Sequence, residues 1–325
     1  IIPSSSLVRH HADCEYPFRQ DSNFWYLTGF DEPDSIALFL SHKPKGERFI
    51  LFVAPKDILS EVWHGFRWGI EGAEKEFKAD KAHSISDFKD LLPVYIGDSE
   101  EIVYSIGKHT KIEKIVLEIF TQLLEARSRV GIGANSITSP DIYLNEMRLI
   151  KSDFEINRMR EATQISAEAH ELVRESISSK KNERQIQGLI EGFFLEKGTR
   201  GPAYNSIVAS GDNACILHYT LNNSELNKGD LLLVDAGCSL TDYYNGDITR
   251  TIPIGGKFSK EQKLIYEIVL EAQKNAIKSS VTGSNSTNVH NVALRILIEG
   301  LKEIGLLRGD TDGIIEKGSY KHLYM

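Results

Sequence analysis

Cysteines are few in this sequence, and they form no pattern. The three of them, Cys14, Cys215 and Cys238, are odd in number and include no close pair, which argues against a framework of disulfide bonds. Unpaired cysteines suit a reducing compartment, so we predict a cytoplasmic location. Long apolar runs are also absent, because the longest, such as 36–40 and 49–55, have the length of a strand and not of a membrane span.

Positive charge is in short supply as well. The 38 Lys and Arg residues against 46 Asp and Glu give a net charge of −8, which is no reason to expect nucleic acid or an anionic membrane as a partner. Hydrophobic content of 41% and charged content of 26% are typical of a globular protein. A length of 325 residues exceeds what most single cores support, so two domains are expected.

The Gly- and Ser-rich segment 131–139 marks the expected domain boundary. Its sequence, GIGANSITS, contains a lone Gly-x-Gly without a third glycine or a clear preceding strand, so a phosphate-binding loop is not indicated. We interpret the segment as a linker between a first domain, residues 1–140, and a second domain, residues 141–325.

In the first domain, strand-like runs alternate with segments of helical spacing. Strands are expected at 36–40, 49–53 and 102–104, and helices near 57–63 and 85–92. This alternation predicts an α/β unit in which helices cover a mixed sheet. The aromatic segment 14–30, CEYPFRQDSNFWYLTGF, is predicted by its composition to form a core strand and a turn that ends at Gly29.

The second domain begins with a capping box. Ser152, with Glu155 three residues later, starts a helix whose apolar residues recur at helical spacing. Helices that alternate with antiparallel hairpins then predict an α+β domain, with the helices on one face of a curved sheet. Further helices are expected at 182–197, 259–278 and 287–304, and segment 201–219 is expected to form a strand, a turn at 210–213 and a second strand.

The stretch 231–253, LLLVDAGCSLTDYYNGDITRTIP, has the most distinctive pattern of the chain. Two β-type runs each hold one acidic residue, Asp235 and Asp247, and the polar residues between them are typical of a turn. A hairpin would set the two carboxylates side by side, where they would repel each other unless a cation lay between them. Paired oxygen ligands suit Mn²⁺ or Mg²⁺. The alternative is that each Asp only begins or ends a strand, as Asp-Gly and Gly-Asp pairs often do.

Two sequence motifs of this stretch, VDAGC and then GDITRTIPIGGKFS, closely resemble the first metal-binding hairpin of the creatinase/aminopeptidase superfamily, which is peptidase family M24. The resemblance is strongest to the bacterial-type Xaa-Pro aminopeptidases of that family. The resemblance implies that Asp235 chelates one of two divalent metal ions, expected to be Mn²⁺, and that Asp247 bridges both. The link between them is one residue longer than expected for the family, and its polar composition places the extra residue in the turn. We expect Asp242 there to be a solvated loop residue and Cys238 to serve packing.

Other segments of the sequence show the same resemblance. The aromatic phrase before Gly29 resembles the amino-terminal domain of bacterial aminopeptidases P, and EVWHGFRWG resembles the segment that reaches a neighbouring subunit's active site, which makes Trp63 a candidate for substrate contact. CILHY matches the family's substrate-side histidine, so His218 is a candidate for a hydrogen bond to developing oxyanion charge. Without the resemblance, such a tryptophan or histidine is more often part of the core. His170 and His290, on predicted helices, are expected to be interfacial or exposed.

The resemblance extends over nearly all of the chain and implies a creatinase-like α/β domain followed by a pita-bread domain. In the family, further metal ligands follow the phrase that SYKHLYM matches, namely a histidine in His-Gly-x-x-His and two glutamates, one of which is the general base. The sequence supplies two of five expected ligands, Asp235 and Asp247, and we expect it to be a portion of a longer protein, cut at both ends. The alternative is a naturally shortened, inactive relative.

The leading hypothesis for function is a dinuclear metalloaminopeptidase that removes the amino-terminal residue of a peptide when proline follows, with His218 aiding the transition state. A prolidase, which acts on Xaa-Pro dipeptides, is the alternative within the same fold. A non-catalytic pita-bread module that binds peptides and a metal-free creatinase-type amidinohydrolase are disfavoured, because neither has a use for paired buried carboxylates. Peptides are the expected partners, and the resemblance implies a homo-oligomer, either a dimer or a tetramer.

Overall fold

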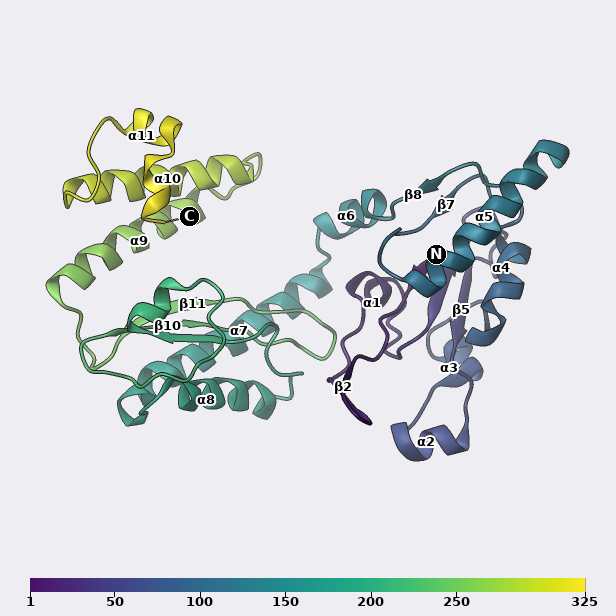
Figure 1. Ribbon diagram of the computed structural model, residues 1–325, viewed down its shortest axis with the longest axis horizontal. Helices are drawn as coiled ribbons and strands as arrows, with labels where there is room; N and C mark the ends of the chain where they lie inside the picture. The colour runs from purple at the N-terminus through teal and green to yellow at the C-terminus, as the bar shows by residue number, and fades with distance from the viewer. Residues whose placement is uncertain (325) are drawn as a thin grey trace. The chain divides into compact units, whose positions relative to one another are not determined.

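The computed structural model describes residues 1–324, and the chain divides into two compact units (Figure 1). The first unit comprises Ile1–Asn157, and the second begins at Arg158. None of the helices formed by the described residues is both long enough and apolar enough to cross a membrane. Each unit has a sheet and a buried core of its own.

The first unit is built on a four-stranded mixed sheet, as predicted. Its strands lie in the order β1-β4-β5-β6, with β5 and β6 parallel and the other neighbours antiparallel. Because side chains alternate along a strand, Leu38 and Phe52 enter a core with α4 and α5, whereas Ala37 and Leu51 enter a second core with α1. The bounds of these elements are β1 (Ile2–Pro3), α1 (Ser22–Thr28), β4 (Ile36–Phe39), β5 (Phe49–Val53), β6 (Lys81–Ser84), α4 (Phe88–Ile96) and α5 (Thr110–Val130).

Shorter elements complete the first unit. The strands β2 and β3 form a two-stranded antiparallel sheet, and β7 and β8 form a two-stranded parallel one. The bounds are β2 (Arg9–His11), β3 (Cys14–Glu15), α2 (Ile58–His64), α3 (Gly69–Lys75), the 3₁₀ helix η1 (Ile85–Asp87), β7 (Ile102–Val103), β8 (Ile137–Thr138) and α6 (Asp141–Leu149).

The aromatic segment 14–30 forms the helix α1, and its only strand residues, Cys14–Glu15, are exposed, so the prediction of a core strand is wrong. The carboxylate of Asp21 accepts hydrogen bonds from the backbone N–H groups of Asn23 and Phe24, both at 2.9 Å, and this cap starts α1. The predicted turn at Gly29 is confirmed, because that residue ends the helix in the left-handed region at φ 65°. The aromatic side chains still serve the core, since Phe24 is fully buried.

Segment 131–139 belongs to the first unit, so its interpretation as a linker is wrong. It contributes β8, which pairs in parallel with β7, and Ala134 within it is fully buried. The following helix α6 also packs on this unit, because Leu144 lies in the core that α1 enters. The first unit therefore extends to Asn157, beyond the expected boundary at residue 140. The small residues of this segment are typical of a linker, which is why a linker was predicted. In the structure, their small size lets the chain pass close to the core.

The second unit places two long helices against a three-stranded antiparallel sheet in the order β11-β10-β9. The predicted capping box starts the first helix, because Ser152 N donates to Glu155 Oε2 at 2.8 Å and Glu155 N donates to Ser152 Oγ at 3.3 Å. Both helices and the sheet contribute to one core. The bounds are α7 (Asp153–Ser176), η2 (Ile177–Ser179), α8 (Glu183–Glu196), β9 (Ile207–Ser210), β10 (Leu231–Asp235) and β11 (Thr249–Pro253).

Three helices follow the sheet. The predicted capping box of Ser259 and Gln262 begins α9, and the helix predicted at 287–304 is α10, which ends one residue earlier. A third helix, α11, was not predicted, and it joins α10 in a separate small core around Ile298. The bounds are α9 (Lys260–Ser279), α10 (Ser286–Glu303), α11 (Thr311–Lys317) and η4 (Ser319–His322).

Only the first of the two strands expected in 201–219 forms. After β9 the chain enters the 3₁₀ helix η3 (Gly211–Cys215) and a turn that contains His218. The second predicted strand is therefore wrong. The physical reason is a set of hydrogen bonds from this segment to a buried carboxylate on α8, which sequence spacing does not reveal.

Candidate metal centre

The hairpin of β10 and β11 keeps one register from its open end to its turn. Leu231 faces Pro253 at the open end, and Asp235 faces Thr249 at the end of the ladder. The same pairing continues beyond the strands to the bridge between Ser239 and Asn245. No residue is inserted within this paired region, so an extra residue can lie only in the turn, where we predicted it.

Three residues, Thr241 to Tyr243, form the turn of this hairpin. Leu240 N donates to Tyr244 O at 2.9 Å to close it, and Tyr243 occupies the left-handed region at φ 66°. A three-residue hairpin loop commonly ends in such a left-handed residue, because this geometry follows the right-handed twist of the strands. The turn therefore returns the chain without disturbing the register of the strands.

Asp235 and Asp247 project from the same face of the hairpin. Asp235 faces Thr249, and because side chains alternate, Asp247 two residues earlier shares that face. The hydroxyl of Tyr204 lies 2.7 Å from Asp235 Oδ1 and 3.1 Å from Asp247 Oδ1. The two carboxylate oxygens can be no farther apart than the sum of these distances, so the structure brings the two predicted residues together.

Tyr204 is a residue of this site that sequence reasoning missed. Burial raises the pKa of its hydroxyl, and the adjacent carboxylates raise it further, so the hydroxyl keeps its proton and donates it. One proton cannot fully satisfy two carboxylates. The remaining negative charge on one face of the hairpin suits a cation. The segment GPAYNS contains no spacing that connects this tyrosine with aspartates 31 and 43 residues away.

The two aspartates fit part of a coordination sphere for a divalent metal ion. Carboxylate oxygens are the ligands that Mn²⁺ and Mg²⁺ prefer. Among residues 1–324, no group of three or more His, Cys, Asp or Glu side chains comes together to hold a metal ion. Asp235 and Asp247 therefore stay a predicted pair of oxygen ligands, and the structure shows only that their side chains lie together.

One glycine lets the hairpin approach α7, and another lets its two strands approach each other. A Cβ atom on Gly246 would lie 2.1 Å from Ser166 Oγ and 2.8 Å from the backbone oxygen of Ala162. The Ser166 hydroxyl oxygen accepts a hydrogen bond from Cys238 N at 3.0 Å and donates to Ala162 O at 2.7 Å. Cys238 itself is fully buried in the core, so its interpretation as a packing residue is confirmed. Gly237 provides the corresponding close approach between the two strands.

An ion pair and a cation-π contact hold the tip of the hairpin. Arg158 donates from Nε to Asp242 Oδ2 at 2.6 Å and from Nη2 to Oδ1 at 3.0 Å, and the Asp242 side chain is 21% exposed. The expectation that Asp242 is a solvated loop residue is therefore wrong. Arg200 lies 4.2 Å above the Tyr243 ring and donates to Thr241 O. With both its oxygens bound by Arg158, Asp242 is not arranged to compete as a metal ligand.

His170 is buried behind the hairpin, which overturns the expectation of an interfacial or exposed position. Its side chain comes from α7, the residue is 5% exposed, and Nε2 lies 3.0 Å from Ala236 O. Because a carbonyl accepts, Nε2 carries the proton of this contact. Burial lowers the pKa of His170, which favours the neutral imidazole. The histidine thus fixes the backbone next to Asp235. The sequence signal for this burial was that His170 follows Ala169, which belongs to the apolar stripe of the predicted helix.

The other predicted site residues lie in exposed positions. His218 is exposed in the turn after η3, and its ring makes no hydrogen bond with the described residues. Trp63 lies on α2 in the first unit and is 83% exposed. His290, on α10, is exposed as expected. No hydrogen bond within residues 1–324 joins His218 to either aspartate.

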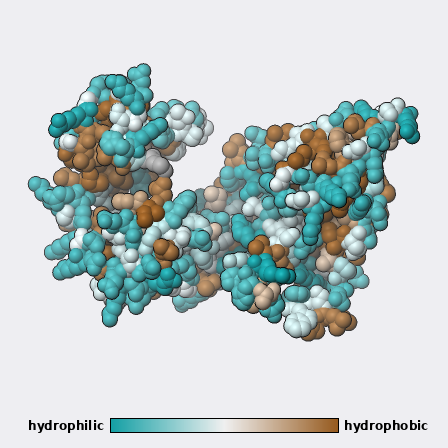
Figure 2. Space-filling view, in the orientation of Figure 1, coloured by the Kyte–Doolittle hydropathy of each residue, from teal (hydrophilic) through white to brown (hydrophobic). Residues whose placement is uncertain are grey.

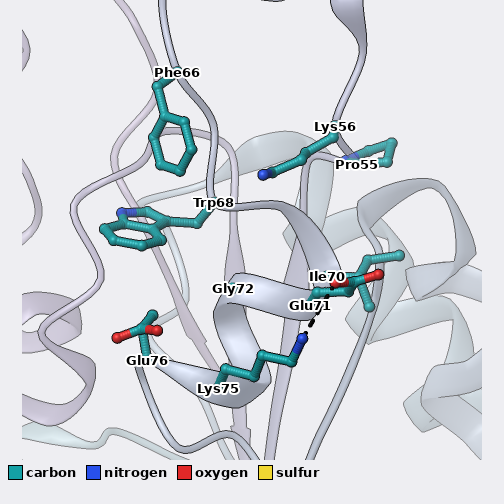
Figure 3. A pocket seen from close by; sticks show the side chains of 9 residues that line it. All are labelled: Pro55, Lys56, Phe66, Trp68, Ile70, Glu71, Gly72, Lys75 and Glu76. Atoms are coloured by element: carbon teal, nitrogen blue, oxygen red, sulfur yellow. Dashed lines mark hydrogen bonds and ion pairs between the residues drawn. The ribbon is translucent and has the colours of Figure 1, made fainter.

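A hollow of about 400 Å³ lies beside α3 in the first unit (Figure 3). Phe66 and Trp68 line it edge to face, with ring centroids 5.0 Å apart. Three of its four charged groups have partners, because Lys56 lies 4.8 Å from the Phe66 ring centroid and Lys75 pairs with Glu71 at 3.4 Å. None of the predicted site residues lines this hollow, so the aspartate pair remains the better candidate for chemistry.

Two protein-family models match the chain. The model of the aminopeptidase P N-terminal domain matches residues 1–104, and that of metallopeptidase family M24 matches residues 157–323. The Xaa-Pro aminopeptidase of Haemophilus influenzae is 42% identical over 333 aligned residues, which cover 99% of this chain and 74% of that protein. The Xaa-Pro aminopeptidase of Escherichia coli is 35% identical, with coverage of 100% and 74%.

Solved structures give the same result. The Pseudomonas aeruginosa aminopeptidase PepP superposes with a TM-score of 0.91 at 36% identity, covering 99% of this chain and 72% of that one. Zinc-substituted E. coli aminopeptidase P in complex with product superposes with a TM-score of 0.90 at 34% identity, with coverage of 98% and 72%. The chain thus spans about three quarters of the length of these relatives.

Proposed function

The chain belongs to metallopeptidase family M24, with an aminopeptidase P amino-terminal domain ahead of a pita-bread α+β domain, and from this premise we propose that it works as a dinuclear Xaa-Pro aminopeptidase. The proposed reaction removes the first residue of a peptide whose second residue is proline. One observation carries the proposal: Asp235 and Asp247 lie on one face of a hairpin and share the hydroxyl of Tyr204.

Each residue of the site has a proposed role. Two divalent ions, Mn²⁺ in our proposal, supply an activated water and polarise the scissile carbonyl when bound. Asp235 and Asp247 hold them, and the Tyr204 hydroxyl orients both carboxylates. His218, which no described residue binds, has an imidazole N–H available to donate to the developing oxyanion.

The metal content of the native protein tests this proposal first. We expect about two Mn²⁺-class ions per chain in the protein as its gene encodes it, because the proposed mechanism uses a pair of divalent ions. Elemental analysis combined with native mass measurement provides the number. A protein that binds no divalent metal would support the alternative of a non-catalytic module that binds peptides.

Substrate length separates the peptidase from a prolidase. Tripeptides and longer peptides that begin Xaa-Pro are expected to be cleaved, with the first residue released. The matched comparison uses Xaa-Pro dipeptides with the same first residue. Cleavage of the dipeptides alone would contradict the aminopeptidase proposal and favour the prolidase.

The helix α2 supports a proposed contact between copies of the chain. Four large apolar side chains on it are exposed, and Figure 2 shows apolar side chains over this helix. Contiguous exposed apolar patches are rare on monomeric proteins, so such a patch indicates an interaction site. We propose that this surface contributes to a dimer or tetramer and that Trp63 contacts the peptide bound by another copy. The four residues are Ile58, Leu59, Val62 and Trp63, which are 76–83% exposed.

Two substitutions on α2 separate assembly from substrate contact. Leu59→Glu places a charge within the apolar surface, so it is expected to reduce the native mass to that of a single chain in sedimentation experiments. Trp63→Ala is expected to keep the oligomer and to raise KM for Xaa-Pro peptides, because it removes contact area without adding charge. An unchanged KM for Trp63→Ala would remove that residue from the site.

We also propose a reducing location, the cytoplasm, for this protein. The structure gives Cys14 and Cys215 as exposed free thiols and Cys238 as a buried one. Exposed free thiols persist most readily where glutathione and thioredoxin keep them reduced.

A further inference from the structure

Glu183 is a fully buried carboxylate at the first turn of α8, and it accepts five hydrogen bonds. Its residue exposure is 0%. Oε1 accepts from Ser210 N at 2.7 Å, from Ser210 Oγ at 2.8 Å and from Asn213 Nδ2 at 3.1 Å. Oε2 accepts from Tyr219 OH at 2.8 Å and from Ser224 N at 2.9 Å.

The charge of Glu183 is stabilised by these donors and not by a cation. Among the described residues, no Lys, Arg or His pairs with it within ion-pair distance. Burying an ionised carboxylate is costly unless hydrogen bonds replace its water. Burial alone would raise the pKa of this carboxyl, yet the hydrogen bonds donated to it outweigh burial and hold the pKa below its ordinary value. The group therefore stays ionised and binds its donors firmly.

The donors to Glu183 all come from one segment, 210–224. Ser210 ends β9 at one limit of the segment, Asn213 lies in η3, and Ser224 marks the other limit. Tyr219 follows His218 directly, and its side chain points inward to Glu183 while His218 is exposed. The Glu183 carboxylate thus binds both ends of segment 210–224. It also binds Tyr219, the residue that follows the exposed His218.

We infer that Glu183 is a positioning residue for His218, because it fixes the turn that presents this histidine to substrate. The inference rests on the proposed function, in which His218 donates to the oxyanion. The Tyr219 contact fixes the backbone immediately after His218, and the Asn213 contact fixes η3 before it. Displacing a transition-state donor by about 1 Å is enough to cost about 100-fold in rate.

The variant Glu183→Gln tests this role. Glutamine retains one acceptor oxygen, but its NH₂ group meets a backbone N–H donor at Ser224 or Ser210, so one end of the segment is released. We expect kcat for an Xaa-Pro tripeptide to fall about 100-fold with little change in KM, because only the transition-state contact is lost. Metal content is expected to stay at the wild-type value, since neither Asp235 nor Asp247 touches Glu183.

Two further variants separate positioning from a general loss of stability. In a His218→Ala background, Glu183→Gln is expected to cause no further fall in kcat, because its effect acts through the histidine. Ile190→Val, a fully buried change on the same helix, lowers stability by removing one methyl group from the core and is expected to leave kcat unchanged. Independent, multiplying losses from Glu183→Gln and His218→Ala would overturn the inference.

Amide hydrogen exchange reports on the segment without using catalysis. In Glu183→Gln, the amides of 211–224 are expected to exchange faster, while those of β10 stay protected as in the wild type. Unchanged exchange in 211–224 would overturn the inference even if kcat fell. A wild-type protein that cleaves no Xaa-Pro peptide would instead defeat the proposed function, and the exchange result would still decide whether Glu183 fixes the turn.

Discussion

Asp247→Asn is expected to abolish tight binding of the divalent metal and to lower peptidase activity by at least about 100-fold. Changes to groups that only support a metal ligand typically cost 10- to 100-fold, so loss of a proposed bridging ligand should cost at least the upper part of that range. The amide keeps the shape of the side chain. It removes one of the two negative charges, that of Asp247, and leaves the charge of Asp235 beside Tyr204.

The same substitution should not weaken the metal-free fold. Without a cation, Asp235 and Asp247 repel each other across the hairpin, and an amide at position 247 relieves that repulsion. The thermal midpoint of the metal-free variant is therefore expected to equal or exceed that of the metal-free wild type. The stabilisation that added Mn²⁺ gives the wild type should be lost in the variant, because only a folded state with its ligands gains from binding.

Asp242→Asn is the matched control, since it makes the same chemical change five residues away in the same hairpin. Asp242 is bound by Arg158, so its loss is expected to lower stability by about 1 kcal/mol and to leave metal affinity unchanged. Calorimetric titration with Mn²⁺ measures the metal affinity of the three proteins, and urea unfolding without metal measures their stability. If Asp242→Asn weakened metal binding as much as Asp247→Asn, the assignment of Asp247 as a ligand would fail.

The hairpin was predictable because its evidence is local. Apolar and acidic residues at strand spacing, separated by turn-forming residues, predict two strands with Asp235 and Asp247 on them, and the structure places both on one face. The environment of Asp242 was not predictable in the same way. Its partner Arg158 lies 84 residues earlier in the chain, on α7, and no spacing in the sequence connects the two.

In two of the wrong predictions, the local composition favoured a strand and other contacts decided the structure. Aromatic residues in 14–30 favour strands by composition, yet the cap at Asp21 and the burial of Phe24 in the core gave a helix. The CILHY phrase has the apolar character of a strand, yet Glu183 draws Tyr219 inward and produces a turn. The Asp21 cap is a local signal that the aromatic composition outweighed in the prediction, whereas the partner Glu183 could be identified only in the folded chain.

Gly237→Ala is expected to destabilise the second unit by at least about 3 kcal/mol, because the hairpin has no room for a methyl group there. A Cβ atom at this position would lie 1.9 Å from Gly246 O and 2.8 Å from Asp247 N. These are backbone atoms of the facing chain, so no side-chain rotation can relieve the contact. The strands must separate where Asp235 and Asp247 are held together, and metal binding should be lost with the stability.

Gly188→Ala makes the same chemical change and is expected to have the opposite effect on stability. Gly188 lies in the interior of α8 on an exposed position, and an added Cβ would have nothing within 4 Å. Alanine there is expected to stabilise the protein by about 0.5–1 kcal/mol, because it lowers the backbone entropy lost on forming the helix. Urea unfolding of both variants measures the two shifts. A Gly237→Ala protein with wild-type stability and metal affinity would show that the two strands of the hairpin can move apart without cost. The close approach of these strands would then have no part in holding the two aspartates.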